Sequence, residues 1–179
     1  NGIWDFKFFE NVRELDLEEK GFPASVTCPD KMKVPFCWQL ELNKGYDVPN
    51  YINQDYPYPV DPPHLPDVIP CALYRKSFSF NKKDAKAYYL SFEGVSAGFY
   101  LWINGEFTGY SQVSHAESRF NVTEKLISGE NVIEALVIKH TDGSYMEDQD
   151  FFRLSGIFRD VYILERDEKH LRDIHIIKE

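Results

Sequence analysis

The sequence predicts an all-β domain, a sandwich or a barrel, and three observations support that fold class. Short strand-like runs recur about every 8–12 residues, which is the strand spacing of sandwiches and barrels. Aromatic residues, which favour half-buried pleated surfaces, are abundant: 14 Phe, 11 Tyr and 3 Trp among 179 residues. Asn104-Gly105 separates two such runs, and Asn-Gly is a strong hairpin signal because both turn positions need a positive φ. No convincing long helix is predicted.

The predicted strands follow one another along the chain. Trp4, Phe6 and Phe8 alternate with polar residues and predict a half-buried first strand. Residues 11–33 are charged and irregular, and their pattern supports at most one helical turn. The remaining predicted strands cover residues 73–80, 88–92, 99–103, 106–110, 132–138, 160–164 and 171–177. The run 132–138 is almost continuously apolar, so we expect it to be buried on both faces.

A long proline-rich segment interrupts these strands. Seven of the ten prolines lie between Pro49 and Pro70. Proline fixes φ and cannot donate a ladder hydrogen bond, which excludes an interior strand or a helix and predicts an extended loop. Tyrosines within and beside the segment indicate that the loop is ordered and packed, and loops of this length are often functional.

The charge and the cysteines exclude several classes of function. The formal net charge is −9 and the isoelectric point is about 5.1, so the basic surface that nucleic acids and anionic membranes require is missing. No apolar run approaches the roughly 20 residues that cross a bilayer. The three cysteines form no CxxC pair, which predicts free thiols in a reducing compartment and favours a cytoplasmic protein. The chain begins without Met, and we expect it to be part of a longer polypeptide.

The densest polar cluster is Glu-Asp-Gln-Asp at 147–150, with Arg153 and Arg159 close behind. Carboxylates this close repel one another unless a cation, an arginine or hydrogen-bond donors compensate them. One interpretation pairs them with the arginines or with solvent, and the other directs at least one carboxylate to a cation or to sugar hydroxyls. Neighbouring acids on one loop do not guarantee the facing geometry of a glycosidase pair. The sequence also has no HExxH, GxSxG or glycine-rich phosphate motif.

Longer motifs resemble the bacterial β-galactosidases of glycoside hydrolase family 2. Residues 145–161, Tyr-Met-Glu-Asp-Gln-Asp-Phe-Phe-Arg-Leu-Ser-Gly-Ile-Phe-Arg-Asp-Val, are similar to a specific segment of that family. Other matching motifs occur in the family's order at 34–35, 38–39, 45–49, 51–57, 61–63, 74–78, 92–95, 102–105 and 109–112. The resemblance covers essentially the whole chain and implies the family's N-terminal sugar-binding domain, a jelly-roll β-sandwich.

The resemblance also implies a domain organisation. We expect one sandwich over residues 1–170, with a long loop over 43–71, and a connection to a following domain over 171–179. In the family an immunoglobulin-like domain and a (β/α)8 barrel follow, and the barrel holds the two catalytic glutamates. A barrel alone needs more than about 200 residues. The chain is therefore expected to be a non-catalytic part of a cytoplasmic, homo-oligomeric β-galactosidase that acts on galactosides, and to be inactive alone.

Two sugar-contacting residues follow from the resemblance. Asn53 matches an asparagine that binds a galactosyl hydroxyl, and Asp150 matches an aspartate that contacts the 6-hydroxyl and a bound sodium ion. An amide can donate and accept at one hydroxyl, and a carboxylate is a hard oxygen ligand. Gln112 and Asp142 match positions that contribute, in some members, to a remote divalent-cation site, for which magnesium is expected. The upstream ligands of that site are absent from this sequence.

The sequence departs from the family pattern at three places, and other hypotheses stay open. Residues 39–45 are longer than the usual link, Arg119 stands where an acid is common, and Phe152 replaces a tryptophan. The alternatives are the equivalent domain of a family-2 β-glucuronidase or β-mannosidase, an autonomous carbohydrate-binding module, and a purely structural or oligomerisation domain. The preferred hypothesis requires the loops that carry Asn53 and Asp150 to meet.

Overall fold

The computed structural model describes residues 1–53, 56, 58–147, 150–167 and 169–178. Strands dominate this part of the chain, and its helices are three short 3-10 turns: η1 (Val12–Glu14), η2 (Trp38–Leu40) and η3 (Asp142–Met146). None of the helices in these ranges is long and apolar enough to cross a membrane.

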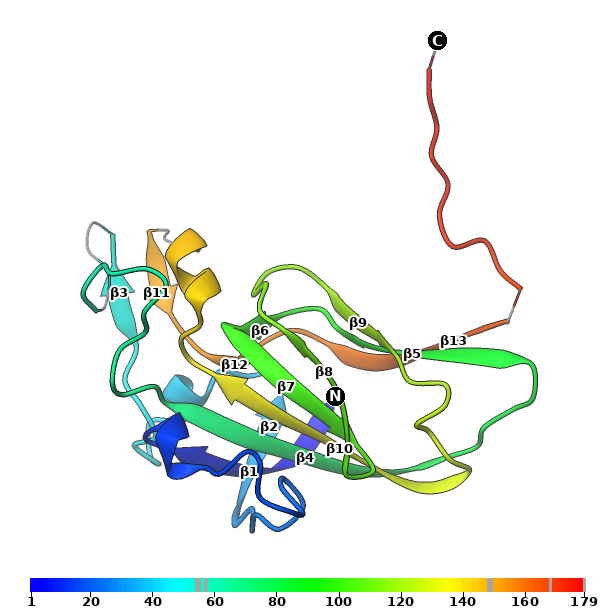
Figure 1. Ribbon diagram of the computed structural model, residues 1–179, viewed down its shortest axis with the longest axis horizontal. Coiled ribbons are helices and arrows are strands. Elements are labelled where there is room, and N and C mark those ends of the chain that lie inside the picture. The colour runs from blue at the N-terminus through cyan, green and yellow to red at the C-terminus, as the bar shows by residue number, and fades with distance from the viewer. Residues whose placement is uncertain (54–55, 57, 148–149, 168, 179) are drawn as a thin grey trace.

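The larger layer is a six-stranded antiparallel sheet in the order β2-β1-β4-β10-β7-β8 (Figure 1). Its strands are β1 (Gly2–Phe9), β2 (Asp30–Val34), β4 (Cys71–Phe80), β7 (Gly98–Ile103), β8 (Glu106–Ser111) and β10 (Gly129–Ile138). β10 pairs with β4 along its whole length and with β7 on its other side. It is therefore an interior strand, as its apolar sequence predicts.

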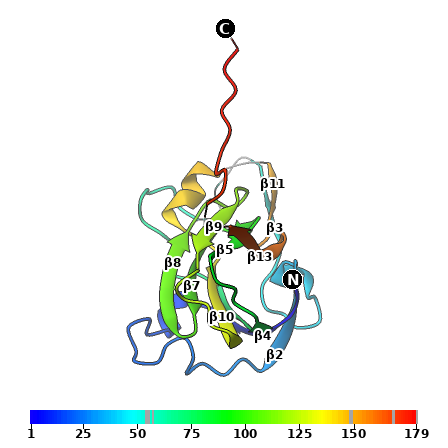
Figure 2. The same cartoon turned by 90° about the vertical axis from the view of Figure 1, so that its right-hand side faces the viewer.

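The smaller layer is a three-stranded sheet in the order β13-β5-β9, which lies across the first sheet (Figure 2). Its strands are β5 (Lys86–Phe92), β9 (Ser118–Asn121) and β13 (Val161–Asp167). Two short ladders complete the fold: β6 (Val95–Ser96) pairs with β12 (Gly156–Ile157), and β3 (Asn50–Ile52) pairs with β11 (Phe151–Arg153). The result is the predicted all-β, jelly-roll sandwich.

The core lies between the two sheets and uses the alternation predicted from the sequence. Trp4 and Phe6 of β1 are buried, and they join Leu90 and Phe92 of β5 in one apolar cluster. Side chains two residues apart share a face of a strand, so each strand places one apolar row into this core. Trp38 and Trp102 are buried as well, as predicted.

The outer face of the larger sheet is also covered. Leu136 and Ile138 of β10 pack there against Phe22 and other apolar side chains of a second cluster. Arg75 of β4 holds this cover in place. Its guanidinium pairs with Glu134 of β10 at 2.7 Å and donates to the carbonyls of Pro23 and Val26 at 2.9 and 3.0 Å. Residues 133–138 are thus buried on both faces, as predicted, and Val132 is half-buried.

The hairpin predicted at Asn104-Gly105 is present between β7 and β8. Asn104 has a φ of 53° and Gly105 a φ of 78°, which is the backbone that this turn requires. The Asn104 side chain accepts a hydrogen bond from the N–H of Val132 at 2.9 Å and donates to Asn131 at 3.0 Å. The turn residue therefore also ties the hairpin to β10.

The three cysteines are free thiols, as predicted. Cys37 and Cys71 are buried, and burial raises the pKa of Cys37 to about 11 and that of Cys71 to about 12. Both side chains therefore stay protonated at neutral pH, which favours a packing role over a reactive one.

Two local predictions were wrong, and one was incomplete. Residues 30–34 form the edge strand β2, because Met32 and Val34 turn inward although the flanking residues are charged. Within the proline-rich segment, Asn50–Ile52 forms a strand, although of an isolated pair and not of a sheet interior. The strand expected at 171–177 is absent: residues 171–178 run away from the sandwich as an exposed tail that pairs with no described strand (Figure 1).

Candidate functional site

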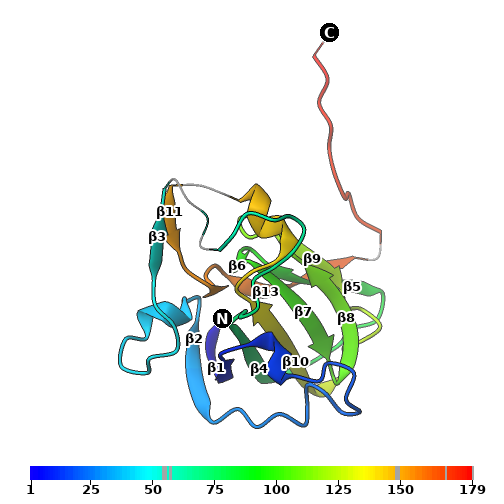
Figure 3. The same cartoon turned by 60° about the vertical axis from the view of Figure 1, so that its left-hand side comes forward.

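The two segments that the sequence singled out meet in a two-stranded antiparallel ribbon, formed by β3 and β11. Ile52 pairs with Phe151, Tyr51 with Phe152, and Asn50 with Arg153. The ribbon projects from one end of the sandwich, beside η3 (Figure 3).

Asn53 directly follows β3 and Asp150 directly precedes β11, so the two residues flank the Ile52–Phe151 pair at the same end of the ribbon. Both residues are exposed at the projecting end of the ribbon. Side chains at facing positions of paired strands can reach one small ligand. The β3–β11 pairing brings together the segments that carry Asn53 and Asp150, almost a hundred positions apart in the chain, and the sugar-binding role of the two residues stays a prediction.

Asp150 is held by a tyrosine of the facing strand. The Tyr51 hydroxyl donates to Oδ1 of Asp150 at 2.5 Å, and the Tyr51 ring packs against Phe152 with centroids 5.4 Å apart. The hydrogen bond to the Asp150 carboxylate raises the pKa of Tyr51, so the phenol remains a donor. Oδ1 of Asp150 therefore points across the ribbon, towards Tyr51 of β3.

Hydrogen-bond donors compensate Glu147, the other acidic residue of the cluster that the structure describes. The Glu147 carboxylate accepts from the backbone N–H of Ser114 at 2.8 Å and from its hydroxyl at 2.6 Å. Arg153 donates to the backbone carbonyl of Glu147 at 3.3 Å, and Arg159 donates to the carbonyl of His115 at 3.0 Å. The other two members of the cluster, at 148 and 149, lie outside the described residues.

An aromatic cluster anchors the proline-rich loop that carries Asn53. The Tyr145 hydroxyl donates to the carbonyl of His64 at 2.6 Å, and the Tyr56 hydroxyl donates to the carbonyl of Tyr145 at 2.5 Å. The Tyr58 ring packs edge-on against the buried His140, with centroids 4.9 Å apart. Burial, with a smaller contribution from nearby Lys139, lowers the pKa of His140 to about 4. The described part of the loop is therefore packed, as its tyrosines predicted.

A buried polar network, which no sequence pattern predicts, lies where the ribbon joins the sandwich. Gln39 donates to Asp47 at 2.9 Å and accepts from the N–H of Ser155 at 2.8 Å. Lys139 forms an ion pair with Asp47 at 2.6 Å, and both side chains are largely buried. Gln39 and Asp47 belong to two of the motifs that resemble the family. These motifs mark both residues, but neither motif predicts that the two side chains form a hydrogen bond.

The two positions suggested for a divalent cation lie close together. An atom added at the Cβ position of Gly143, the neighbour of Asp142, would be 3.4 Å from the Gln112 amide. Gln112 Oε1 accepts from the Tyr110 hydroxyl at 2.7 Å, and Asp142 Oδ1 accepts from the N–H of Gly143 at 2.9 Å. Within the described ranges, no three His, Cys, Asp or Glu side chains form a cluster that could hold a metal ion.

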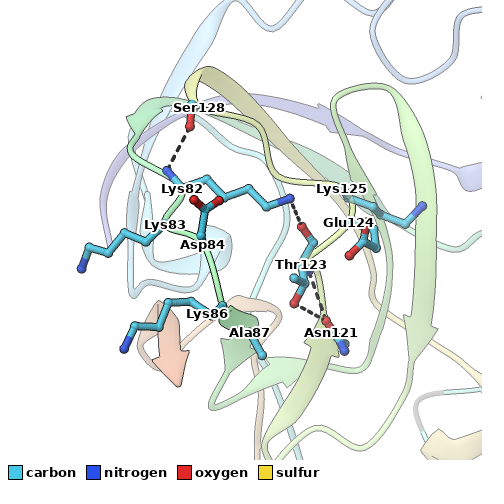
Figure 4. A pocket seen from close by; sticks show the side chains of 11 residues that line it. Lys82, Lys83, Asp84, Lys86, Ala87, Asn121, Thr123, Glu124, Lys125 and Ser128 are labelled. Carbon is cyan, nitrogen blue, oxygen red and sulfur yellow. Dashed lines mark hydrogen bonds between the residues drawn. The ribbon is translucent and has the colours of Figure 1, made fainter. Parts of the chain in front are cut away.

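A surface hollow of about 810 Å³ lies away from the ribbon, between the turn after β4 and the segment after β9 (Figure 4). Four lysines line it, but each has a partner. Lys82 donates to the carbonyl of Thr123 at 2.6 Å. The other lysines form ion pairs: Lys83 with Glu165, Lys86 with Asp167, and Lys125 with Glu106. This arrangement explains the hollow as a solvated, charge-balanced surface.

Comparisons with known proteins agree with the fold and with the motifs. Residues 1–167 match the family described as "Glycosyl hydrolases family 2, sugar binding domain". The β-galactosidase of Staphylococcus xylosus is 46% identical over 177 residues, which are 98% of this chain and 17% of that protein. The β-galactosidase of Actinobacillus pleuropneumoniae is 43% identical over 176 residues, with the same two shares.

Two solved structures are also similar. A β-glucuronidase from an uncultured Clostridium species has a TM-score of 0.66 and 25% identity, over 94% of this chain and 28% of that chain. The β-glucuronidase of Bacteroides uniformis has a TM-score of 0.62 at 18% identity, over 91% of this chain and 17% of that one, which supports the fold alone. The chain spans about a sixth of the length of the curated relatives it matches.

Proposed function

The chain belongs to glycosyl hydrolases family 2, to its sugar-binding domain, and on this premise we propose that it is a non-catalytic domain of a β-galactosidase. In this proposal Asn53 and Asp150 contribute to a galactose pocket whose catalytic glutamates lie in a barrel elsewhere in the longer enzyme. The identity of 42–46% with curated β-galactosidases supports a galactoside as the substrate class. We also propose that an immunoglobulin-like domain joins the two parts and that the enzyme is a cytoplasmic homo-oligomer.

The observation that carries the proposal is the ribbon itself. Its register supports a placement of Asn53 opposite Asp150, and both residues are exposed where the ribbon projects. Side chains needed only for folding would be expected nearer the core, whereas side chains offered to a pocket on another domain must project from it. The ribbon meets that requirement.

The chemistry of the pair suits a sugar. The Asn53 amide can donate to one lone pair of a hydroxyl and accept its proton, and the Asp150 carboxylate can accept from a neighbouring hydroxyl. Because Tyr51 engages Oδ1 of Asp150, Oδ2 is the oxygen we assign to the ligand. The chain's role is to bind and orient the galactosyl group, and bond cleavage is assigned to groups outside it.

Sodium is the cation that the resemblance implies at Asp150. The fit is partial: the carboxylate is a hard oxygen ligand, exposed at the end of the ribbon, and the remaining ligands would come from outside this chain. A bound sodium ion would neutralise the carboxylate and provide a further oxygen-binding position. Gln112 and Asp142 are proposed as two ligands of a remote magnesium site in the longer enzyme, where their second lone pairs remain for a cation.

The test uses the longer enzyme with the substitutions Asp150→Ala and Asn53→Ala. Each should lower kcat/KM for nitrophenyl galactoside by at least about 100-fold, because a buried sugar hydroxyl then loses its partner. Glu130→Ala, at an exposed position on β10, is the matched control and should change kcat/KM by less than about twofold. Activity of the Asp150→Ala enzyme close to that of the native enzyme would remove the site assignment.

A β-glucuronidase is the second candidate, because a solved β-glucuronidase shares this fold at 25% identity. A β-mannosidase has the same architecture and is the third. Assays of the longer enzyme with nitrophenyl galactoside, glucuronide and mannoside separate the three. Turnover of the glucuronide or the mannoside in preference to the galactoside would contradict the galactoside assignment.

A further inference from the structure

We propose that Gln39 is a positioning residue. It connects β3 and β11 at the base of the ribbon, where both strands leave the sandwich, and so sets the separation of Asn53 and Asp150. This inference rests on the proposed function, because it assigns Gln39 a role in presenting the sugar-contacting pair. Gln39 itself does not touch the sugar.

The geometry that supports this role is a single side chain that bridges two strands. Gln39 Nε2 donates to Oδ2 of Asp47 at 2.9 Å, and Gln39 Oε1 accepts from the N–H of Ser155 at 2.8 Å. Asp47 lies three residues before β3, and Ser155 lies two residues after β11. One amide group, 1% exposed, therefore connects both strands of the ribbon where they leave the sandwich.

Lys139 attaches this clasp, formed by Gln39, Asp47 and Ser155, to the central strand of the larger sheet. The Lys139 ammonium group forms an ion pair with Oδ2 of Asp47 at 2.6 Å. The Lys139 side chain is 6% exposed and the Asp47 side chain is 12% exposed. Its backbone N–H, just after β10, donates to the carbonyl of Pro70 at 2.9 Å. A buried charge that loses its partner is strongly destabilising, so Asp47 is held at this position.

The orientation of the Gln39 amide follows from its partners. The Asp47 carboxylate can only accept a hydrogen bond, and the Ser155 N–H can only donate one. The segment that carries Gln39 is fixed in turn, because the backbone N–H of Trp38 donates to the carbonyl of Ser155 at 3.1 Å. Only a primary amide satisfies both partners at once. Glutamate would place a second negative charge beside Asp47. Methionine would leave the Ser155 N–H without its side-chain acceptor and would remove one donor to Asp47, whose ion pair with Lys139 remains.

The ribbon needs such a clasp because it is short. It has three residue pairs, and an isolated two-stranded hairpin is only marginally stable in water. Without a fixed base, the two strands could splay or change direction, and Asn53 and Asp150 would then no longer face one ligand. The clasp supplies the missing constraint from inside the protein.

The first test measures hydrogen exchange at backbone amides of the ribbon in the 179-residue chain. Gln39→Met should raise exchange at the ribbon amides at least tenfold relative to the native chain. Gln39→Glu keeps the acceptor for the Ser155 N–H and should leave that amide protected, yet still loosen the β3 side through repulsion from Asp47. Because the glutamate variant is nearly isosteric, it carries the test if the methionine variant does not fold.

Asn131→Asp is the matched control. Asn131 is another fully buried amide, which bridges Asn104 and the backbone of Ile127 far from the ribbon along β10. It should lower global stability without raising ribbon exchange selectively. Unchanged ribbon exchange in both Gln39 variants, or an equal rise in the Asn131 control, would overturn the proposal.

The second test measures kinetics of the longer enzyme. Gln39→Met should raise KM for nitrophenyl galactoside at least fivefold with a smaller change in kcat. A misplaced Asn53–Asp150 pair would bind the substrate and the transition state less tightly by similar amounts, which raises KM more than it lowers kcat. Faster amide exchange in the ribbon with an unchanged KM would confirm that Gln39 stabilises the ribbon, and it would contradict the role of the ribbon in sugar binding. The two proposals therefore fail in distinguishable ways.

Discussion

Gly156, in the Ser-Gly-Ile-Phe-Arg motif, occupies a position that no other residue fits. Its φ is 137°, and a Cβ atom there would lie 2.7 Å from the carbonyl oxygen of Phe36 and 3.0 Å from the hydroxyl of Tyr74. Gly156→Ala should therefore destabilise the domain by about 2–4 kcal/mol, measured by urea unfolding. Gly105→Ala is the control, because Gly105 also has a positive φ but nothing within 4 Å of a Cβ. Equal losses for the two variants would mean that steric overlap is unimportant.

His140 makes the stability of the domain dependent on pH. Its pKa is about 4 in the folded protein and 6.5 in an unfolded chain. Between these values the unfolded chain takes up a proton that the folded protein excludes, so stability is complete above pH 6.5 and falls as the pH drops towards 4. The loss should be about 3 kcal/mol.

The measurement compares the native chain with His140→Phe, which keeps an aromatic ring against Tyr58 but cannot titrate. Unfolding free energies of both chains are recorded from pH 7 to pH 4. The native chain should lose about 3 kcal/mol more than the variant. A constant difference between the two chains across this range would contradict the assignment, since other titrating groups are common to both.

The Arg75–Glu134 pair connects two neighbouring strands and the segment that covers them. The Glu134 side chain is 2% exposed, and Arg75 also donates to the carbonyls of Pro23 and Val26. Arg75→Met leaves a buried carboxylate without its partner and should cost about 3–5 kcal/mol of unfolding free energy. The double variant Arg75→Met with Glu134→Leu should recover much of that loss. A double variant no more stable than the single one would show that the contacts to residues 23–26 matter more than the ion pair.

At the level of elements, strands with clean alternation could be predicted and the others could not. Tyr88, Leu90 and Phe92 alternate and lie in the core as expected, and Asn104-Gly105 forms the expected hairpin. β2 escaped prediction because charged residues surround Met32 and Val34. The tail after 170 has an apolar strand pattern, but no described strand lies beside it, and a strand exists only where another one pairs with it.

The candidate site shows the same division. The motifs predict a sugar-binding role for Asn53 and Asp150, and that role stays a prediction. The pairing of the segments that carry them follows from the β3–β11 register, which no local pattern reveals. Gln39, Asp47 and Lys139 could not be assigned, because polar residues far apart in sequence become one network only after the sheets have packed. Long-range pairing of polar groups leaves no periodic signal in the sequence.

For the whole molecule, an exposed ribbon end predicts weak sugar binding by the isolated chain. Asn53 and Asp150 are both exposed, and two polar contacts on an open surface gain little over water. Calorimetric titration of the 179-residue chain with galactose and lactose should show millimolar affinity or no binding. Micromolar affinity would instead support an autonomous carbohydrate-binding module.

The ribbon stands outside the apolar core and joins it through a polar clasp, so the proposed sugar-contacting residues and the residues of the core are separate sets. Changes at the ribbon end can then accumulate without loss of the sandwich, while changes in the core are constrained by packing. Substitutions at the ribbon end that alter the preference for a glycoside should therefore cost the sandwich little stability.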